Sequence, residues 1–217
     1  MIENGEPSAP SAPVPLPRSG AGNVLEVIYG ILFAPRAAFG RLSARPPLAF
    51  GLITAAVVSV LLLLANVRSL TAVLSELGAP QAGLLAGMLA LALLPLAALG
   101  FLFTAATYDF TAQLLGGRGA AVGMTALLGL AELPRLALLP VAAFVDAVWV
   151  VALVAVGIAA WVAVLRVLAI MALYRIGAGR AVVTVVAVPV LVGMVAALIV
   201  GAFWGTIVSM VFLTYGS

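Results

Sequence analysis

Residues 48–67 read LAFGLITAAVVSVLLLLANV and contain no charged side chain. A transmembrane helix needs about 20 mainly apolar residues, so this segment alone is long enough to cross a bilayer. Four more long apolar stretches follow, at residues 83–115, 120–145, 147–173 and 181–213. The sequence therefore predicts an all-α polytopic membrane protein, a bundle of five transmembrane helices.

The composition of the whole chain agrees with a hydrocarbon environment. Of its 217 residues, 65% are hydrophobic and 8% are charged, and the mean hydropathy is +1.32. Soluble domains are about a quarter charged, so a water-soluble globule of this composition would have too few polar groups to cover its surface. We expect an integral, multi-pass membrane protein in contact with membrane lipids, in the inner membrane if the cell is bacterial.

The residue types that are missing narrow the chemistry. The chain has no cysteine and no histidine, and all ten of its basic residues are arginine. Histidine or thiolate metal sites, cysteine nucleophiles, Ser-His-Asp triads and Schiff-base lysines are thereby excluded. The net charge of +3 is spread along the chain, which argues against nucleic acid as a partner. We predict a protein that is not an enzyme and that has no cofactor and no metal site.

Two segments precede the first span. Residues 1–22 are rich in proline and small residues and are predicted to form a disordered cytoplasmic tail. In residues 23–45 apolar positions recur at helical spacing beside several arginines, which predicts an amphipathic arm in the headgroup region. The alternative is that this arm packs on the rest of the protein. Its marker residues are Pro35, Arg36, Phe39, Arg41 and Leu42.

The arginines in the short loops predict the orientation in the membrane. If the N-terminus is cytoplasmic, seven of these arginines fall on the cytoplasmic side and Arg68 alone lies outside. Cytoplasmic loops carry an excess of arginine and lysine, so this distribution favours a cytoplasmic N-terminus. With five spans, the C-terminus is then external. Residues 46–217 form the predicted membrane domain.

Polar side chains inside the predicted spans are candidates for a functional site. A charge at bilayer depth costs about 2.5 to 3.5 kcal/mol, so each one needs a partner or a route to water. Asp109 and Arg166 lie at similar depth, about 10 Å from the cytoplasmic ends of their spans, which predicts an ion pair between them. The predicted intramembrane polar cluster comprises Asp109, Gln113, Glu132, Arg135 and Arg166.

The third span carries two of these charges near its middle. Glu132 and Arg135 are three residues apart, so they share one helical face and partly neutralise each other. Pro134 lies between them and removes a backbone hydrogen bond, which predicts a broken helix. A broken, charged helix is typical of transporter sites. Two interpretations stay open: a site for a solute, and a polar cluster that only fixes the packing of the bundle.

Prolines and glycines are expected to shape the remaining helices. Kinks are predicted where a proline interrupts a span, at Pro95, Pro134 and Pro189. Close helix contacts are predicted where two glycines are four residues apart, at Gly83, Gly87, Gly201 and Gly205.

Four short motifs occur in order along the chain. They read ILFAPRAAFGRL at residues 31–42, LLGGRG at 114–119, GLAELP at 129–134 and YRIGAGRA at 174–181. In this order and spacing they resemble the Yip domain family of Ypt/Rab-interacting membrane proteins, and in particular its prokaryotic branch. The resemblance extends from about Val24 to the C-terminus.

The resemblance implies five membrane helices and a cytosolic N-terminus. It also implies a non-enzymatic role, because the eukaryotic members are trafficking factors that bind small GTPases and each other. The acidic-aromatic motifs of those members are absent here, so small-GTPase binding is not carried over. Our first hypothesis is therefore a scaffold or assembly factor of Yip type, acting as a homo-oligomer or with other membrane proteins. The alternative is a small transporter or channel with a midplane site at Glu132 and Arg135.

Overall fold

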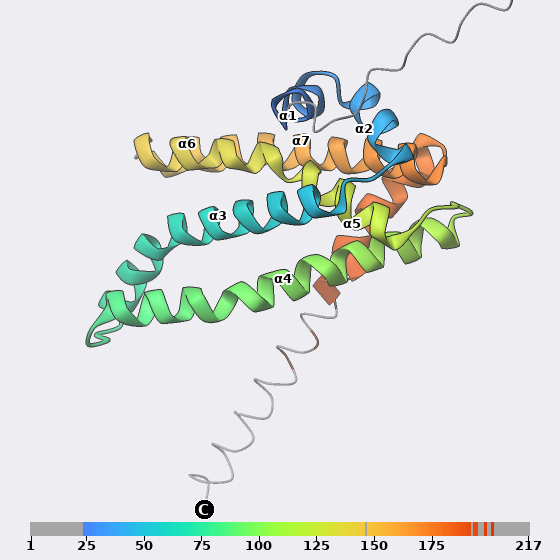
Figure 1. Cartoon of the computed structure of the whole chain (residues 1–217). Coiled ribbons are helices and arrows are strands. Elements are labelled where there is room, and N and C mark those ends of the chain that lie inside the picture. The colour runs from blue at the N-terminus through green and yellow to red at the C-terminus, as the bar shows by residue number, and fades with distance from the viewer. Residues whose placement is uncertain (1–23, 146, 192, 195–197, 199–200, 202–217) are drawn as a thin grey trace, which may run out of the picture.

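The computed structural model describes residues 24–145, 147–191, 193, 194, 198 and 201, and within them all regular structure is helical (Figure 1). The predicted tail, residues 1–22, lies outside the described residues. The elements in chain order are α1 (Val24–Phe33), α2 (Pro35–Ala44), α3 (Leu48–Glu76), α4 (Ala82–Leu114), α5 (Ala121–Ala131), the 3₁₀ helix η1 (Leu133–Ala137), α6 (Leu138–Phe144) and α7 (Val148–Tyr174). A further helix, Ala178–Leu191, follows α7.

Among the described residues, four stretches of helix are long and apolar enough to cross a membrane. They are Leu48–Glu76, Ala82–Leu114, Ala121–Val141 and Trp149–Tyr174. Of the fifth predicted span, residues 181–213, the structure describes the part within the helix Ala178–Leu191 and a few positions beyond it. The helical membrane fold is thus confirmed, and the count of five spans stays a prediction.

The first span is longer than its apolar segment. The sequence predicts an end near Val67, where Asn66 and Arg68 break the apolar run, but α3 continues to Glu76. The amide of Asn66 donates to the carbonyl of Leu62 at 2.7 Å, a bond that stays within the helix. The polar residues end the apolar segment without ending the helix, because asparagine and arginine are tolerated in a helix interior, unlike proline.

The third predicted span is broken where Pro134 predicts it. α5 ends at Ala131, Glu132 caps it, and η1 and α6 continue the chain. Proline has no backbone N–H and its ring clashes with the preceding turn, so it is tolerated at the start of the next helix. Pro134 occupies such a position in η1. Glu132 therefore lies at a junction between two helical segments.

α5 is the central element of the bundle. It contacts α3, α4, α7 and α2, and eight of its eleven residues are buried. One apolar cluster joins α5 to the ends of α4 and α7 and to the helix Ala178–Leu191 through Met124, Tyr108, Tyr174 and Val188. A second joins it to α1, α2 and α7 through Leu127, Leu130, Ile31 and Phe39. Glu132, the residue that follows α5, therefore lies at the end of a helix that is packed against several neighbours.

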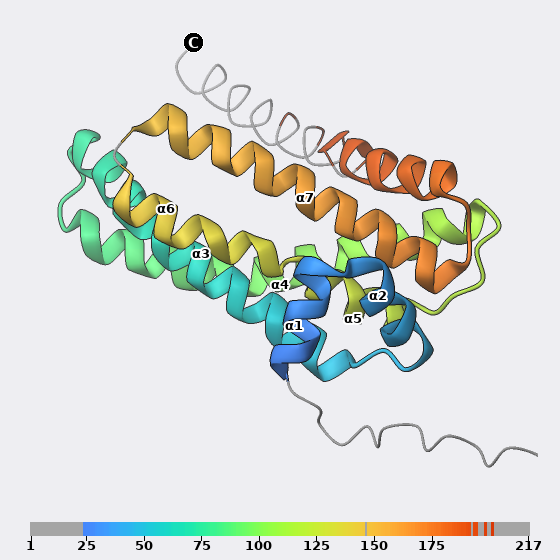
Figure 2. The same cartoon turned by 90° about the horizontal axis from the view of Figure 1, so that it is seen from above.

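The two N-terminal helices pack on the bundle. Figure 2 shows α1 and α2 next to α5 and α7, and Ile31 and Phe39 are fully buried there. The apolar stripe that predicted a membrane-bound arm thus faces the protein at these two positions, as the alternative interpretation expected. Arg36 and Arg41 are exposed, and Arg41 lies 3.5 Å from Glu26 of α1.

Candidate functional site

A close crossing of α3 and α5 fixes the position of the site. A Cβ atom on Gly51 would collide with the backbone of Ala126, and one on Gly129 would collide with the backbone of Gly51. Small residues of this kind let two membrane helices approach until their backbones touch. The sequence motif GLAELP contains Gly129, so the same short segment provides the crossing and the carboxylate three residues later.

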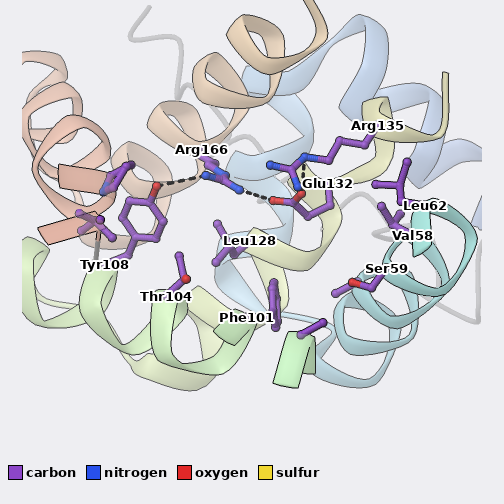
Figure 3. A pocket seen from close by; sticks show the side chains of 15 residues that line it. Val58, Ser59, Leu62, Phe101, Thr104, Tyr108, Leu128, Glu132, Arg135 and Arg166 are labelled. Atoms are coloured by element: carbon purple, nitrogen blue, oxygen red, sulfur yellow. Dashed lines mark hydrogen bonds and ion pairs between the residues drawn. The ribbon is translucent and has the colours of Figure 1, made fainter. Parts of the chain in front are cut away.

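Glu132 joins two arginines. Its Oε2 lies 2.8 Å from Nε of Arg135, and its Oε1 accepts from Nη2 of Arg166 at 2.5 Å. Nη1 of Arg166 in turn donates to the hydroxyl of Tyr108 at 3.2 Å. Figure 3 shows Arg166 between Tyr108 and Glu132, with Arg135 on the other side of the carboxylate. The four side chains come from α4, the end of α5, η1 and α7, so they tie four segments together.

The 3₁₀ geometry explains the first of these pairs. In a 3₁₀ helix, side chains three residues apart eclipse one another. Glu132 precedes η1 directly, and Arg135 is the third residue of that helix, so its guanidinium lies over the carboxylate. The spacing that predicted this pair on an α-helix thus produces it through a tighter turn, made possible by Pro134.

These charges line a hollow of about 520 Å³ within the bundle. Pockets that hold small molecules have volumes of about 300 to 1,000 Å³. The polar groups of its wall are Ser59, Thr104, Tyr108, Glu132, Arg135 and Arg166, and the other lining residues are apolar or glycine. Figure 3 shows Val58, Leu62, Phe101 and Leu128 among them. The ionic cluster therefore forms one part of the wall of a hollow that is otherwise mainly apolar.

The predicted pair between Asp109 and Arg166 is wrong. Arg166 contacts Glu132 and Tyr108, while Oδ1 of Asp109 accepts from the hydroxyl of Tyr174 at 2.5 Å. Oδ2 of Asp109 accepts from the amide of Gln113 at 2.9 Å. Adjacent residues on a helix point about 100° apart, so Tyr108 and Asp109 face different neighbours even though they lie at one depth.

The polar residues of the predicted cluster thus form two separate networks. We name the first the charged network, made of Tyr108, Arg166, Glu132 and Arg135, and the second the tyrosine network, made of Gln113, Asp109 and Tyr174. Sequence reasoning missed both tyrosines as site residues. Two features of the sequence could have indicated them. Tyr108 directly precedes Asp109, and Tyr174 is the first residue of the motif YRIGAGRA.

The tyrosine network holds a loop at the end of the bundle. A Cβ on Gly117 or Gly119 would come within 3.0 Å of the Tyr174 side chain, so only glycine fits against that ring. Gly116 has a φ of +87°, which glycine adopts at no steric cost. The guanidinium of Arg180 donates to the carbonyl of Leu115 at 3.2 Å. The structure therefore brings the motifs LLGGRG and YRIGAGRA into contact.

The prolines predicted to kink helices and the glycines predicted to join them lie in several different surroundings. Pro95 lies inside α4, which continues through it, and Pro189 lines the hollow. Gly83, Gly87 and Gly201 have open space where a Cβ would be, so they make no close contact with the described residues of this chain. Gly205 lies outside the described residues. Among the described residues, a close backbone contact between two spans is made by Gly51 and Gly129, which the spacing rule did not select.

The class of protein follows from these features. In the part of the chain that the structure describes, four long apolar helices and a buried ionic cluster define a polytopic helical membrane protein. The chain belongs to the Yip1 family: the Yip1 domain matches residues 29–201, well over half of its length. The match begins within α1 and includes both networks. No curated protein and no solved structure matches the chain.

Proposed function

We propose that this Yip1 family protein is a non-enzymatic membrane scaffold that recruits a partner through the outer face of its N-terminal arm, helices α1 and α2. The observation that supports this most directly is the packing of α1 and α2 against the membrane-spanning helices. Ile31 and Phe39 are fully buried against the bundle, so their side chains anchor α1 and α2 to the spans. A rigidly held surface element suits recruitment, because little ordering entropy is lost when a partner binds.

The outer face of the arm carries groups suited to a partner. Tyr29 and Phe33 are exposed, with ring centroids 4.7 Å apart, and Arg36 and Arg45 are exposed on α2 and at its end. Aromatic residues and arginine are enriched among the residues that dominate binding energy in protein interfaces. A homo-oligomer or another membrane protein would use the same face.

The placement of the arginines supports a cytoplasmic location for this face. Six of the seven arginines predicted to be cytoplasmic are described: Arg36, Arg41, Arg45, Arg118, Arg175 and Arg180. All belong to the arm or to the loops and helix ends next to it, since α2 contacts α5 and α7 and the Arg118 N–H donates to the carbonyl of Tyr174. An arginine-rich end of the bundle is expected to remain in the cytoplasm.

Substitution of the outer face tests this proposal better than removal of the arm. Removing α1 and α2 would expose the apolar surface beneath Ile31 and Phe39, which would confuse loss of folding with loss of a partner. We therefore compare Arg36→Glu/Arg45→Glu with the control Arg118→Glu/Arg175→Glu, which reverses two exposed charges elsewhere at the same end. Each variant is purified from its native host in mild detergent, and the accompanying proteins are quantified by mass spectrometry.

The expected result is a stoichiometric partner that is retained by the wild type and the control and is lost from the arm variant. Recovery of only this chain and lipid from the wild type would contradict the scaffold. Loss of the partner from both double variants would contradict the assignment to the arm.

A second candidate function is transport of a small solute, and the hollow lined by Glu132, Arg135 and Arg166 favours it. An ionisable group inside the membrane is a candidate for a substrate or proton path. Glu132 would be the protonatable group and the arginines its electrostatic partners. Liposome flux that is abolished by Glu132→Gln and kept by Glu76→Gln would support transport. Flux that is unchanged in Glu132→Gln would remove this site as its path.

A further inference from the structure

The charged network has an excess of positive charge. Its one carboxylate, Glu132, lies between two guanidinium groups, those of Arg135 and Arg166. Residues 192–216 contain no aspartate or glutamate, so that segment cannot supply a second counter-charge. Asp109 is engaged by Tyr174 and Gln113 in the other network. Among the described residues, one formal positive charge therefore stays without a matching carboxylate.

Donor groups of Arg135 remain available on the wall of the hollow. Arg166 contributes charge but no free donor edge, because Nη1 and Nη2 are engaged by Tyr108 and Glu132 and its Nε is buried. The side chain of Arg135 is 39% exposed and lines the hollow, and its pair with Glu132 uses Nε. A guanidinium has five N–H donors in a fixed fork, so the outer edge of Arg135 can still take a planar carboxylate in bidentate fashion.

Apart from Ser59, Thr104 and Tyr108, the rest of the hollow is lined by apolar residues and glycine, and it adjoins a groove. A second space of about 340 Å³ lies between α3 and α4, and apart from Ser59 its lining residues are apolar. Ala55, Ser59 and Phe101 line both the hollow and this groove. A ligand anchored at Arg135 would therefore meet an apolar path leading toward the outer surface of α3 and α4.

The depth of the arginines selects among anionic lipids. Arg166 is eight residues before the end of α7, about 12 Å along the helix, and Glu132 is about 16 Å from the start of α5. Counted from those helix ends, the charged network lies about 12 to 16 Å into a bilayer whose hydrocarbon core is about 30 Å thick. A phospholipid would have to bring its glycerol backbone and both ester groups to that depth. A single-chain carboxylate brings only the group that Arg135 binds.

We propose that the hollow is a binding site for a long-chain fatty acid, with its carboxylate on Arg135, next to the charge of Arg166, and its hydrocarbon chain along the groove between α3 and α4. The single negative charge of the ligand matches the single excess positive charge of the site. The apolar walls match the chain, whereas a small inorganic anion would leave them without a partner. The inference rests on the hollow and is independent of the arm-based scaffold.

Native mass spectrometry of the purified full chain in detergent micelles tests this site. Oleate, oleyl alcohol and dioleoyl phosphatidylglycerol are added separately at equal concentration, and the bound fraction of each is measured. The test variant is Arg135→Gln, which leaves Glu132 paired with Arg166. The control is Arg68→Gln, which removes an exposed arginine of α3 away from the hollow. A third variant, Ala98→Phe, fills the groove from an exposed position of α4.

The expected result is oleate binding that falls about tenfold or more in Arg135→Gln and is unchanged in Arg68→Gln, since a hydrogen bond to a charged group accounts for a factor of this size. Oleyl alcohol is expected to bind weakly to all variants, and Ala98→Phe to lower oleate binding as well. Equal oleate binding by the wild type and Arg135→Gln would overturn the proposal. Arg135-dependent binding of phosphatidylglycerol in place of oleate would overturn the assigned ligand, and oleate binding unaffected by Ala98→Phe would overturn the chain path.

Discussion

The charged network and the tyrosine network begin at neighbouring residues of α4 and have opposite designs. Tyr108 leads to Arg166, Glu132 and Arg135 beside a hollow of about 520 Å³, and positive charge is in excess there. Asp109 leads to Tyr174, whose ring is packed against the glycine loop. In the charged network, donor groups of Arg135 face the hollow. In the tyrosine network, the polar groups are used in contacts within the chain. Similar polar residues in one membrane bundle can therefore line a hollow in one place and hold a loop in another.

Loss of the shared carboxylate should have the largest effect. In Glu132→Gln, both arginines keep their charge at bilayer depth without a counter-charge, and breaking a buried ion pair from one side costs about 3 to 5 kcal/mol. We expect a decrease of that size in the free energy of unfolding, measured by titration with sodium dodecyl sulfate in mixed micelles. Glu76→Gln, at the exposed end of α3, serves as the control and should change little. A stability equal to the wild type in Glu132→Gln would show that the charges are solvated instead of paired.

Overpacking of the crossing between α3 and α5 should disturb the charged network. In Gly129→Ala, the new Cβ meets the backbone of Gly51, and overpacking of this kind costs about 1 to 3 kcal/mol. Because Glu132 follows three residues later, we also expect its contact with Arg166 to be displaced, which cross-linking or spectroscopy of labelled α5 and α7 can detect. Gly83→Ala adds the same methyl group in open space and is the matched control. Equal stability of the two variants would contradict the close crossing.

Removal of one hydroxyl from the tyrosine network should have a smaller effect. Tyr174→Phe loses the hydrogen bond to Asp109 but keeps the ring that packs on Gly117 and Gly119. Hydrogen bonds between membrane helices contribute about 0.6 kcal/mol on average and up to about 1.7 kcal/mol, so we expect a loss near 1 kcal/mol in the same titration. Oleate binding should not change. A loss of oleate binding in this variant would show that the two networks are coupled.

The smallest effect is expected at the exposed edge of the tyrosine network. Gln113→Ala removes the bond from its amide to Asp109, which is exposed to solvent or headgroups. Water or lipid can replace that donor, so the expected loss of unfolding free energy is about 0.5 kcal/mol or less. A loss larger than that of Tyr174→Phe would place the main support of Asp109 on Gln113 instead.

The sequence predicts the elements of this fold better than their contacts. Apolar length predicts α3, α4 and α7, and Pro134 predicts the break after Glu132, because both depend on local chemistry. The sequence predicts the end of α3 too early, near Val67, because Asn66 stays within the helix. The helical face of each polar residue decides its partner, and depth alone does not provide that information.

The glycine contacts show the same limit. The four-residue spacing selects Gly83, Gly87, Gly201 and Gly205. The close crossing of α3 and α5 occurs at Gly51 and Gly129, which lie on different helices far apart in the sequence. Such a contact depends on how α3 and α5 cross, which is a property of the assembled bundle. The glycines of the motif LLGGRG likewise acquire their role only when Tyr174 is placed against them.

A pair of double-mutant cycles tests most directly whether the two networks are separate. One cycle combines Glu132→Gln with Arg166→Gln, and the other combines Asp109→Asn with Arg166→Gln, with unfolding free energies measured in mixed micelles. Residues in direct contact show coupling energies of about 0.5 to 3 kcal/mol, whereas residues without a shared partner add. We predict coupling in the Glu132 cycle and additivity in the Asp109 cycle. Coupling between Asp109 and Arg166, with additivity for Glu132, would contradict the account.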